Sequence, residues 1–462
     1  MTRRLMGLLL LVPLITACAL SDELASTTGT GPTAAAREEM TAPLARAPRS
    51  APAAAVSLGD LLSGVDGGNL DLEVVRQQVL QASSRVDQTR SALLPNLGVS
   101  TDVTLVARRT GQGAFKGDRA TLRFSAGFSL PLDLSGTLAE RVRAAQARYR
   151  AATVTEEVTR REQRAALVLA YFNLLEADAL LDVSESTISQ LERELSDVRA
   201  RLEAGTVRRS DVLSVEVALG EARQRRLELE TTRQESVRAL NMAAGYPVGH
   251  PTRIVAWTQR VVAPVSALPE LDRARTTNPE VDVLVETLVA ISHDREAADR
   301  STSPSLAIGP QLTYDSTTAL NPNLNGNAFL SMSWNPDLNG RVAAEIRELD
   351  ASRAEVEVRV RSLLRHIEDR ILAAHRRAVE SEAAGRVASD SLAQATENQR
   401  VIQEQLKAGV ATGRDSLEAE AALARTRATL STAGYRTALG VFQMRFAAGE
   451  DPLDTLKVLT AP

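Results

Sequence analysis

The chain of 462 residues contains a single cysteine, Cys18, and its aromatic residues make up only 3%. One cysteine excludes an internal disulfide and a metal site built from several thiolates. So few aromatic side chains are unusual for one large globular core and favour helices that pack through Ala, Leu and Val. Lysine occurs only at positions 116, 407 and 457, so arginine supplies most of the positive charge. The net charge of −4 gives no reason to expect a nucleic-acid partner.

Motifs of common catalytic and cofactor sites are also missing. The sequence has no Gly-x4-Gly-Lys phosphate loop, no His-Glu-x-x-His and no Gly-x-Ser-x-Gly. His366 and His375 are nine residues apart and fall on opposite faces of a helix, and His250 and His293 are isolated. We therefore expect no enzyme activity, no catalytic residue, no cofactor and no metal site.

The first residues have the pattern of an export signal. Arg3 and Arg4 precede a short apolar run, Leu5–Ile15, which is too short to span a membrane as a helix. Leu14-Ile15-Thr16-Ala17-Cys18 follows and resembles the lipobox of bacterial lipoproteins. The resemblance implies that residues 1–17 are a signal peptide and that Cys18 is acylated. An ordinary signal peptide with an incidental cysteine is the alternative.

Acyl chains on Cys18 would anchor the chain in a membrane, since each buried methylene contributes about 0.8 kcal/mol. Ala19 follows the cysteine in place of aspartate, which by resemblance to lipoprotein sorting favours the outer membrane. Residues 19–57 are rich in Ala, Thr, Ser and Pro and keep no period of 2 or 3.6 residues. We predict that residues 18–57 form a mostly disordered, lipid-anchored tether.

The remainder is an internal duplication. Residues 201–219 are echoed by residues 405–423, an offset of 204, with Leu, Ala, Gly, Asp, Leu, Glu, Ala and Leu in common. Asp133-Leu-Ser-Gly136 matches Asp337-Leu-Asn-Gly340 at the same offset, whereas Asn69 and Asn278 are 209 apart, as are Pro95 and Pro304. The first copy therefore carries five extra residues, which we place around 111–118. We predict two structural repeats, 58–255 and 256–450, and a C-terminal tail, 451–462.

Each repeat contains two stretches in which apolar and polar residues alternate. They predict strands over about 94–107 and 120–131, and over about 304–315 and 327–335. The Gly- and Asn-rich connectors 108–119 and 316–327 are expected to be surface loops. Strands of about 9–11 residues with one apolar face are typical of a transmembrane β-barrel. A soluble, half-buried hairpin gives the same alternation, so the pattern alone leaves both possibilities open.

Long helical patterns follow each hairpin. Residues 137–204 contain no proline or glycine, and residues 341–408 are interrupted only by Gly385. Such a helix would be about 100 Å long and needs partners to pack against. Shorter helices are expected over about 210–244 and 414–448, running back antiparallel. Helices over about 69–92 and 278–301 would stack end to end on these returning helices.

Four amphipathic strands are too few to close a barrel. An open edge in lipid leaves backbone groups unpaired at several kcal/mol each, whereas three chains would supply twelve strands and remove every edge. The sequence offers no further strands for a single-chain barrel. We therefore expect a mainly α protein with a small transmembrane β part, which forms as a homotrimer a 12-stranded barrel continued by an α-helical tunnel.

Several of these features together resemble the TolC-like outer-membrane factor family, over roughly residues 58–450. They are the repeated Leu-x-Ala-Gly-x5-Asp turn, Asn278-Pro279-Glu280 at a helix start, Leu94-Pro95-Asn96-Leu97 at a strand start, and the Asp-Leu-Ser/Asn-Gly junction. Each motif is weak alone, but their order and repetition are specific. The first repeat departs from the pattern with Asn69-Leu70, and Gly413 is an extra glycine near the second turn.

The resemblance implies an outer-membrane channel of a tripartite efflux or type I secretion system. Such a channel extends into the periplasm as a passive conduit and docks a periplasmic adaptor (membrane fusion) protein and an inner-membrane pump or ABC exporter. The alternative is a periplasmic structural or adaptor coiled-coil lipoprotein without a pore. The alternating strands favour the channel, because a spacer needs no lipid-facing hairpin.

By the same resemblance, the turns at Gly205 and Gly409 lie at the periplasmic end and dock the adaptor. Asp415 and Glu418 match positions that form acidic rings in the family, and their spacing places both carboxylates on one helix face. A further set would complete the periplasmic gate, consisting of Asp211, Arg208 and Arg414, with Arg209 nearby. The alternative is that Asp211 and Asp415 only stabilise the first turns of their helices.

Overall fold

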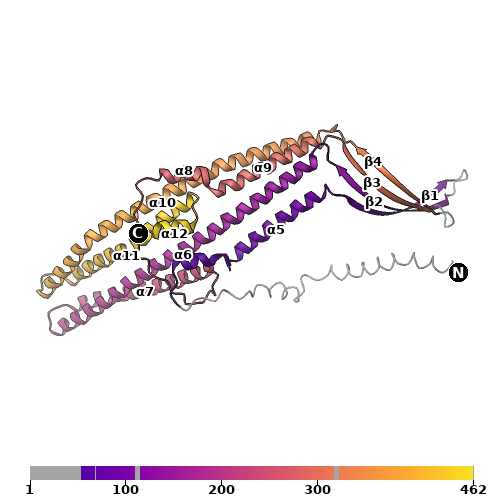
Figure 1. Ribbon diagram of the computed structural model, residues 1–462. Helices are drawn as coiled ribbons and strands as arrows, with labels where there is room; N and C mark the ends of the chain where they lie inside the picture. The colour runs from indigo at the N-terminus through magenta and orange to yellow at the C-terminus, as the bar shows by residue number, and fades with distance from the viewer. Residues whose placement is uncertain (1–53, 68, 110–114, 317–321, 461–462) are drawn as a thin grey trace. The chain divides into compact units, whose positions relative to one another are not determined.

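The computed structural model describes residues 54–67, 69–109, 115–316 and 322–460. The description below concerns the compact unit formed by residues from Ala51 onward (Figure 1). The expected signal peptide, the acylated Cys18 and the tether up to residue 53 lie outside the described residues. No helix among the described residues is both long and apolar enough to cross a membrane.

The two repeats have the same order of elements. The first consists of α4 (Leu58–Gly64), the 3-10 turn η2 (Val65–Gly67), α5 (Leu70–Ser91), β1 (Asn96–Arg109), β2 (Phe115–Leu132), α6 (Thr137–Glu203) and α7 (Arg209–Ala244). The second consists of α8 (Leu268–Thr277), α9 (Pro279–Arg300), β3 (Ser305–Ser316), β4 (Pro322–Ser333), α10 (Arg341–Lys407) and α11 (Gly413–Ala447), after which α12 (Pro452–Thr460) ends the described chain.

Four boundaries differ clearly from the sequence-based expectations. The strands extend into the expected loops 108–119 and 316–327, because β2 begins at Phe115 and β4 at Pro322 and both keep antiparallel pairing there. The expected tail 451–462 contains α12, whose Leu459 is buried in the main core. The tether ends before residue 57, since Val56 is buried and pairs in parallel with Ile254.

Equivalent junctions of the two repeats are made by the same contacts. The carboxylate of Asp133 accepts from the backbone N–H of Ala139 at 2.8 Å, and that of Asp337 accepts from Ala343 at 3.0 Å. The glycines that follow, Gly136 and Gly340, have φ of 75° and 71°, a region that glycine adopts without strain. Asn69 and Asn278 likewise cap α5 and α9 through their side-chain oxygens. The residues repeated in the sequence therefore make the same hydrogen bonds in both repeats.

The strands form one antiparallel sheet in the order β1-β2-β3-β4. Its register places Val99 beside Ala126, Ala126 beside Leu312 and Leu312 beside Gly326. Because side chains alternate between the faces, this register gathers most of the apolar residues of the strands on one face. The repeats meet between β2 and β3, where a Cβ atom on Gly309 would lie 1.7 Å from the carbonyl oxygen of Phe128. Only glycine fits at this position.

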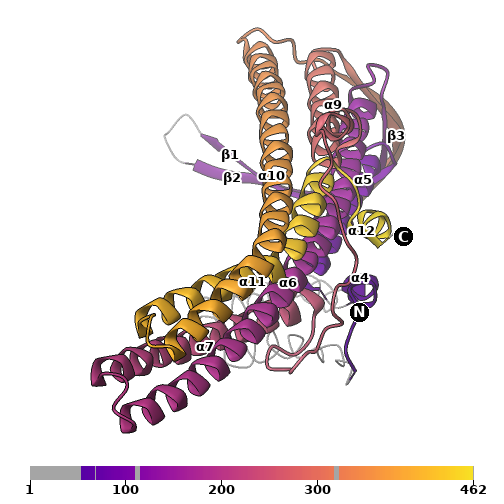
Figure 2. The same ribbon diagram turned by 90° about the vertical axis from the view of Figure 1, so that its left-hand side faces the viewer.

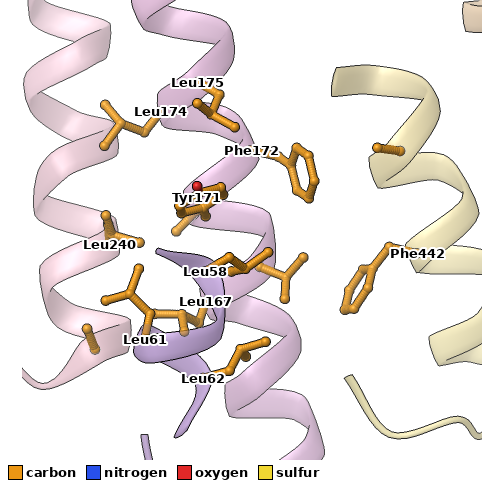
Figure 3. Packing of buried hydrophobic residues seen from close by; sticks show 14 of the residues in the cluster. Leu58, Leu61, Leu62, Leu167, Tyr171, Phe172, Leu174, Leu175, Leu240 and Phe442 are labelled. Carbon is orange, nitrogen blue, oxygen red and sulfur yellow. The ribbon is translucent and has the colours of Figure 1, made fainter. Parts of the chain in front are cut away.

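The main hydrophobic core surrounds the middle of α6 (Figure 3). Leu167, Tyr171 and Leu174 of α6 are almost fully buried. They pack against side chains from other elements, among them Leu58, Leu61 and Leu62 of α4, Leu240 of α7 and Phe442 of α11. The Tyr171 hydroxyl donates to the carbonyl of Val255, which lies in the segment between α7 and α8. This bond links that segment to α6.

The helices lie in neighbouring columns, and α6 is the helix of the first repeat that packs most extensively against the second. It contacts α5 and α7 of its own repeat and α9 and α11 of the other, and α10 contacts α9 and α11. Figure 2 shows the α6–α7 and α10–α11 hairpins running together. Small residues let α10 and α11 approach closely. Cβ atoms on Gly440 and Gly385 would lie 2.9 Å from those of Ala378 and Ala433, respectively.

The close approach of α10 and α11 can be tested at Gly440. Replacing Gly440 with valine forces the isopropyl group into Ala378, and overpacking of this kind costs roughly 1–3 kcal/mol. We expect a lower midpoint of thermal unfolding for Gly440→Val, followed by circular dichroism at 222 nm. Gly434→Ala on the same helix is the control, because nothing lies within 4 Å of its Cβ position. That variant should unfold at the same or a higher temperature. Equal midpoints for Gly440→Val and the unaltered chain would contradict the packing argument.

Candidate functional site

The long helices α6 and α10 end in the same kind of turn. After α6, Thr206 N–H donates to Arg201 and Gly205 N–H to Leu202, at 2.9 and 3.0 Å. After α10, Val410 and Gly409 repeat these bonds to the carbonyls of Gln405 and Leu406. Gly205 and Gly409 have φ of 73° and 75°, as this helix-ending motif requires. The two glycines therefore reverse the chain at the tip of each helical hairpin.

Asp211 and Asp415 occupy equivalent positions in the first turns of the returning helices. The carboxylate of Asp415 accepts from the backbone N–H of Thr412 at 2.8 Å and from its hydroxyl at 2.6 Å, while its own N–H donates to the Thr412 hydroxyl. Asp211 accepts from the N–H of Arg208 at 3.0 Å. The bonds between Asp415 and Thr412 form a reciprocal cap of the kind seen at helix starts, and Asp211 makes only the accepting half of it. The hydrogen bonds from Thr412 also lower the pKa of Asp415.

The arginines at the tips do not hold these aspartates in the single chain. Arg414 donates to Glu418 at 2.9 Å, one turn further along α11, and both side chains are exposed. This bond raises the pKa of Arg414. Among the residues that the structure describes, the guanidinium of Arg208 takes part in no ion pair, and only the backbone N–H of Arg208 donates to Asp211. Within one chain, the expected gate acids are therefore cap residues and a surface ion pair.

The two tips lie side by side. A Cβ atom on Gly413 would be 3.6 Å from the Cβ of Asp211, so the starts of α7 and α11 are in contact. The guanidinium of Arg201 on α6 donates to the carbonyl of Leu406 at the end of α10, at 3.2 Å. The structure thus brings together residues that the sequence places about two hundred positions apart.

A polar cluster between the hairpins was not anticipated from the sequence. Glu420 of α11 is buried and accepts hydrogen bonds from Gln190 of α6 and Gln399 of α10. Nearby, the hydroxyl of Ser416 donates to Glu194 at 2.5 Å. Gln190, Glu194, Gln399 and Ser416 line a hollow of about 360 Å³ between α6, α10 and α11. Three helices from both repeats are therefore joined here by polar contacts.

Burial raises the pKa of both glutamates in this cluster. Loss of water is the main cause for each, and the negative charge of Glu194 further raises the pKa of Glu420. Each pKa lies above its unfolded value, so the stabilising contribution of each group is complete below the unfolded pKa. It is lost as the pH rises through the raised value. The contact between the hairpins should accordingly weaken as these carboxyls ionise.

Comparison of equivalent positions in the two repeats shows which part of this polar cluster could have been predicted from the sequence. Ser416 and Glu420 correspond to Val212 and Glu216 of the first repeat. Val212 packs in the apolar cluster between α6 and α7, and Glu216 is half exposed and accepts from Arg199 at 2.6 Å. A serine that replaces an inward-facing valine was a detectable departure. The burial of Glu420 was not detectable, because the same residue type is exposed in the other repeat.

The sheet is the second candidate site. Its apolar face is exposed, with Val99 and Leu330 retaining 60% and 67% of their accessible surface. The same face carries further exposed apolar side chains, namely Leu97, Val103, Leu122, Phe124, Phe128, Ile308, Leu312, Leu324 and Met332. On the opposite face, Ser100 and Ser125 share a hydrogen bond of 2.8 Å. Exposed apolar patches of this extent mark a surface that meets lipid or protein.

The histidines do not converge. His293 contacts Glu140, His375 contacts the carbonyl of Pro264, and His250 contacts Thr252. Within the described ranges, no group of three or more His, Cys, Asp or Glu side chains is placed to hold a metal ion.

Comparison with known proteins gives one family match and several structural matches. Residues 61–246 match the outer membrane efflux protein family. Comparison with curated protein sequences finds no significant match.

Several solved structures share the fold. The CmeC outer membrane channel of Campylobacter jejuni is 16% identical with a TM-score of 0.74, covering 87% of this chain and 89% of that one. CusC is 17% identical with a TM-score of 0.73, covering 85% and 92%. The MtrE outer membrane channel of Neisseria gonorrhoeae, in its open state, is 17% identical with a TM-score of 0.71, covering 85% and 89%. Most of the first repeat therefore matches the outer membrane efflux protein family, and most of the chain's length has the fold of these solved channel structures.

Proposed function

We propose that three copies of this chain form an outer-membrane channel, in which a twelve-stranded β-barrel continues into an α-helical tunnel in the periplasm. The channel is a passive conduit of a tripartite efflux or type I secretion system. It works with a periplasmic adaptor and an inner-membrane pump or ABC exporter, and has no catalytic role. The observation that carries this proposal is a four-stranded sheet with one exposed apolar face and two unpaired edges.

The edges require partners. Among the described strands, β1 and β4 each pair on one side only. In lipid, an unpaired backbone group costs several kcal/mol, and closing the sheet removes both edges. β1 of one copy would pair with β4 of the next, and the apolar face would turn toward the acyl chains. A periplasmic spacer without a pore is disfavoured, because it would leave this face in water.

The helices present matching free sides. α5 and α7 lie on one flank of α6, and α10 lies on the other flank of the chain, beyond α9 and α11. Both flanks expose apolar residues, including Leu70, Val74 and Leu80 of α5 and Val358 and Val387 of α10. Association about a threefold axis would bring these flanks together in the same order as the strand edges. The same threefold rotation would therefore pair the strand edges and cover the exposed flanks of the helices.

The tips supply the periplasmic end in this proposal. The turns at Gly205 and Gly409 would dock the adaptor, and Asp415 and Glu418 of three copies would form an acidic ring, with Asp211, Arg208 and Arg414 around it. Repulsion within such a ring would be balanced by arginines or counter-ions. The N-terminal tether would hold the channel to the outer membrane through acylated Cys18.

The conduit itself is tested in planar bilayers. The detergent-purified protein should migrate as a trimer that dissociates on heating, and its insertion should give discrete single-channel conductance steps. A heat-denatured sample is the control. A folded protein that gives no conductance under these conditions would overturn the channel.

The acidic ring is tested at Asp415 and Glu418. Asp415→Ala combined with Glu418→Ala should raise the leak conductance and reduce the preference for cations, because the ring loses its charge. Asp415→Asn with Glu418→Gln is the control for the helix cap, since an amide oxygen can still accept from Thr412. If the alanine pair changes conductance and the amide pair does not, the effect belongs to the cap and not to the charge.

The lipid anchor is tested at Cys18. Mass spectrometry of the mature protein should find an acylated N-terminal cysteine. Cys18→Ser should abolish acylation and leave the precursor uncleaved or processed elsewhere. The Ala19→Ser variant keeps a non-acidic residue after the cysteine and should be acylated and sorted normally. An unmodified Cys18 in the mature protein would exclude the anchor.

A further inference from the structure

One row of the sheet concentrates charge on the polar face. The register pairs Asp102 of β1 with Arg123 of β2, and Arg123 with Asp315 of β3. The guanidinium of Arg123 donates to the carboxylate of Asp315 at 2.7 Å. The three side chains thus stand next to one another on adjacent strands, at one level of the sheet.

The polar face between this row and the helices carries no charge. The next rows consist of Ser100, Ser125, Thr313 and Asn325, and then of Gly98, Gly127, Gln311 and Asn327. Beyond them lie Asn96, Ser129, Gly309 and Phe329, then Pro131, Ala307 and Ser331, and finally Ser305 and Ser333. Toward the helices, the charged row is therefore followed only by uncharged rows.

We infer that Asp102, Arg123 and Asp315 form a charged belt in the wall of the channel, near its outer mouth, which favours cations and cationic groups over anions. The inference rests on the proposed trimeric barrel, whose lumen the polar face would line. Each copy contributes two carboxylates and one guanidinium. Because Arg123 is bound to Asp315, Asp102 supplies the excess negative charge, and the trimer carries three such charges.

The dimensions make the belt effective. Twelve strands about 4.8 Å apart and tilted by about 40° enclose a barrel with a backbone radius of about 12 Å. The Debye length at physiological ionic strength is about 8 Å. Side chains that project inward bring their charges within one Debye length of much of the lumen. The belt therefore acts on ions and charged solutes that pass it, and its influence weakens in high salt.

A thiol placed one row below the belt reports its potential. Ser100 lies two residues from Asp102 on the same face, about 7 Å away along the strand. Cys18 is the only natural cysteine, so Ser100→Cys introduces a single new thiol. In the full-length trimer at low salt, we would compare its reaction rates with a trimethylammonium and a sulfonate methanethiosulfonate of similar size. The protein without the added thiol gives the background from Cys18.

The cationic reagent should react faster, by a ratio that the belt controls. Adding Asp102→Asn should lower the cation-to-anion ratio about two- to fivefold, and adding Arg123→Gln should raise it by a similar factor. Thr313→Asn, an uncharged change in the row of Ser100, is the matched control and should leave the ratio unchanged. High salt should reduce all of these differences.

The outcomes separate this inference from the proposed function. If the thiol reacts but Asp102→Asn and Arg123→Gln do not shift the ratio in opposite directions, the belt is refuted and a water-filled lumen remains. If the thiol in the folded trimer reacts with neither reagent, the polar face does not line water. That result would overturn the proposed channel as well.

Discussion

The packing of side chains around α6 is the interaction on which the rest of the structure depends. An isolated helix of this length has no tertiary contacts to stabilise its surface, and most helical stability in proteins comes from an apolar face that is packed. α6 obtains that packing from both repeats at once. α4, α7, α11 and α12 converge on its middle, and α5 and α9 lie along its first half. Without α6, the first and second repeats would meet only in the sheet and at the tips.

The same arrangement leaves strand edges unpaired and apolar side chains exposed in the single chain. The sheet has two free edges and an apolar face in contact with nothing, and the flanks of the helical columns expose valines and leucines. The backbone groups of an edge strand pair with another strand when one is available, so these edges are candidate contacts with a further chain. In the proposed trimer, one threefold rotation would pair the strand edges and bury the exposed apolar flanks of the helices. In that proposed trimer, the charged belt and the acidic tips would lie at the two ends of one conduit, and the sheet between the belt and the helices would form an uncharged wall.

Much of the fold could be predicted because its determinants are local. The long helices, expected over 137–204 and 341–408, occupy Thr137–Glu203 and Arg341–Lys407 in the structure. Neither stretch contains proline, and the single glycine, Gly385, lies inside α10 where it packs against Ala433 of α11. Strand ends were less predictable. The chain near Phe115 and Pro322 is paired by backbone hydrogen bonds, and these depend on the facing strand and not on the side chains that the pattern displays. α12 was missed because its burial comes from distant helices.

The sequence by itself determined the repeat, its turns and its caps. Gly205, Gly409, Asp211 and Asp415 act through the backbone within a few residues, so equal sequences give equal contacts in both copies. Only the tertiary structure decided what the equivalent positions on the helix faces do. Glu216 faces solvent and accepts from Arg199, whereas Glu420 is enclosed by α6 and α10 and accepts from two glutamines. The reason is physical: α7 lies at one flank of α6, while α11 lies between α6 and α10, so the same residue type has water beside it in one repeat and protein in the other.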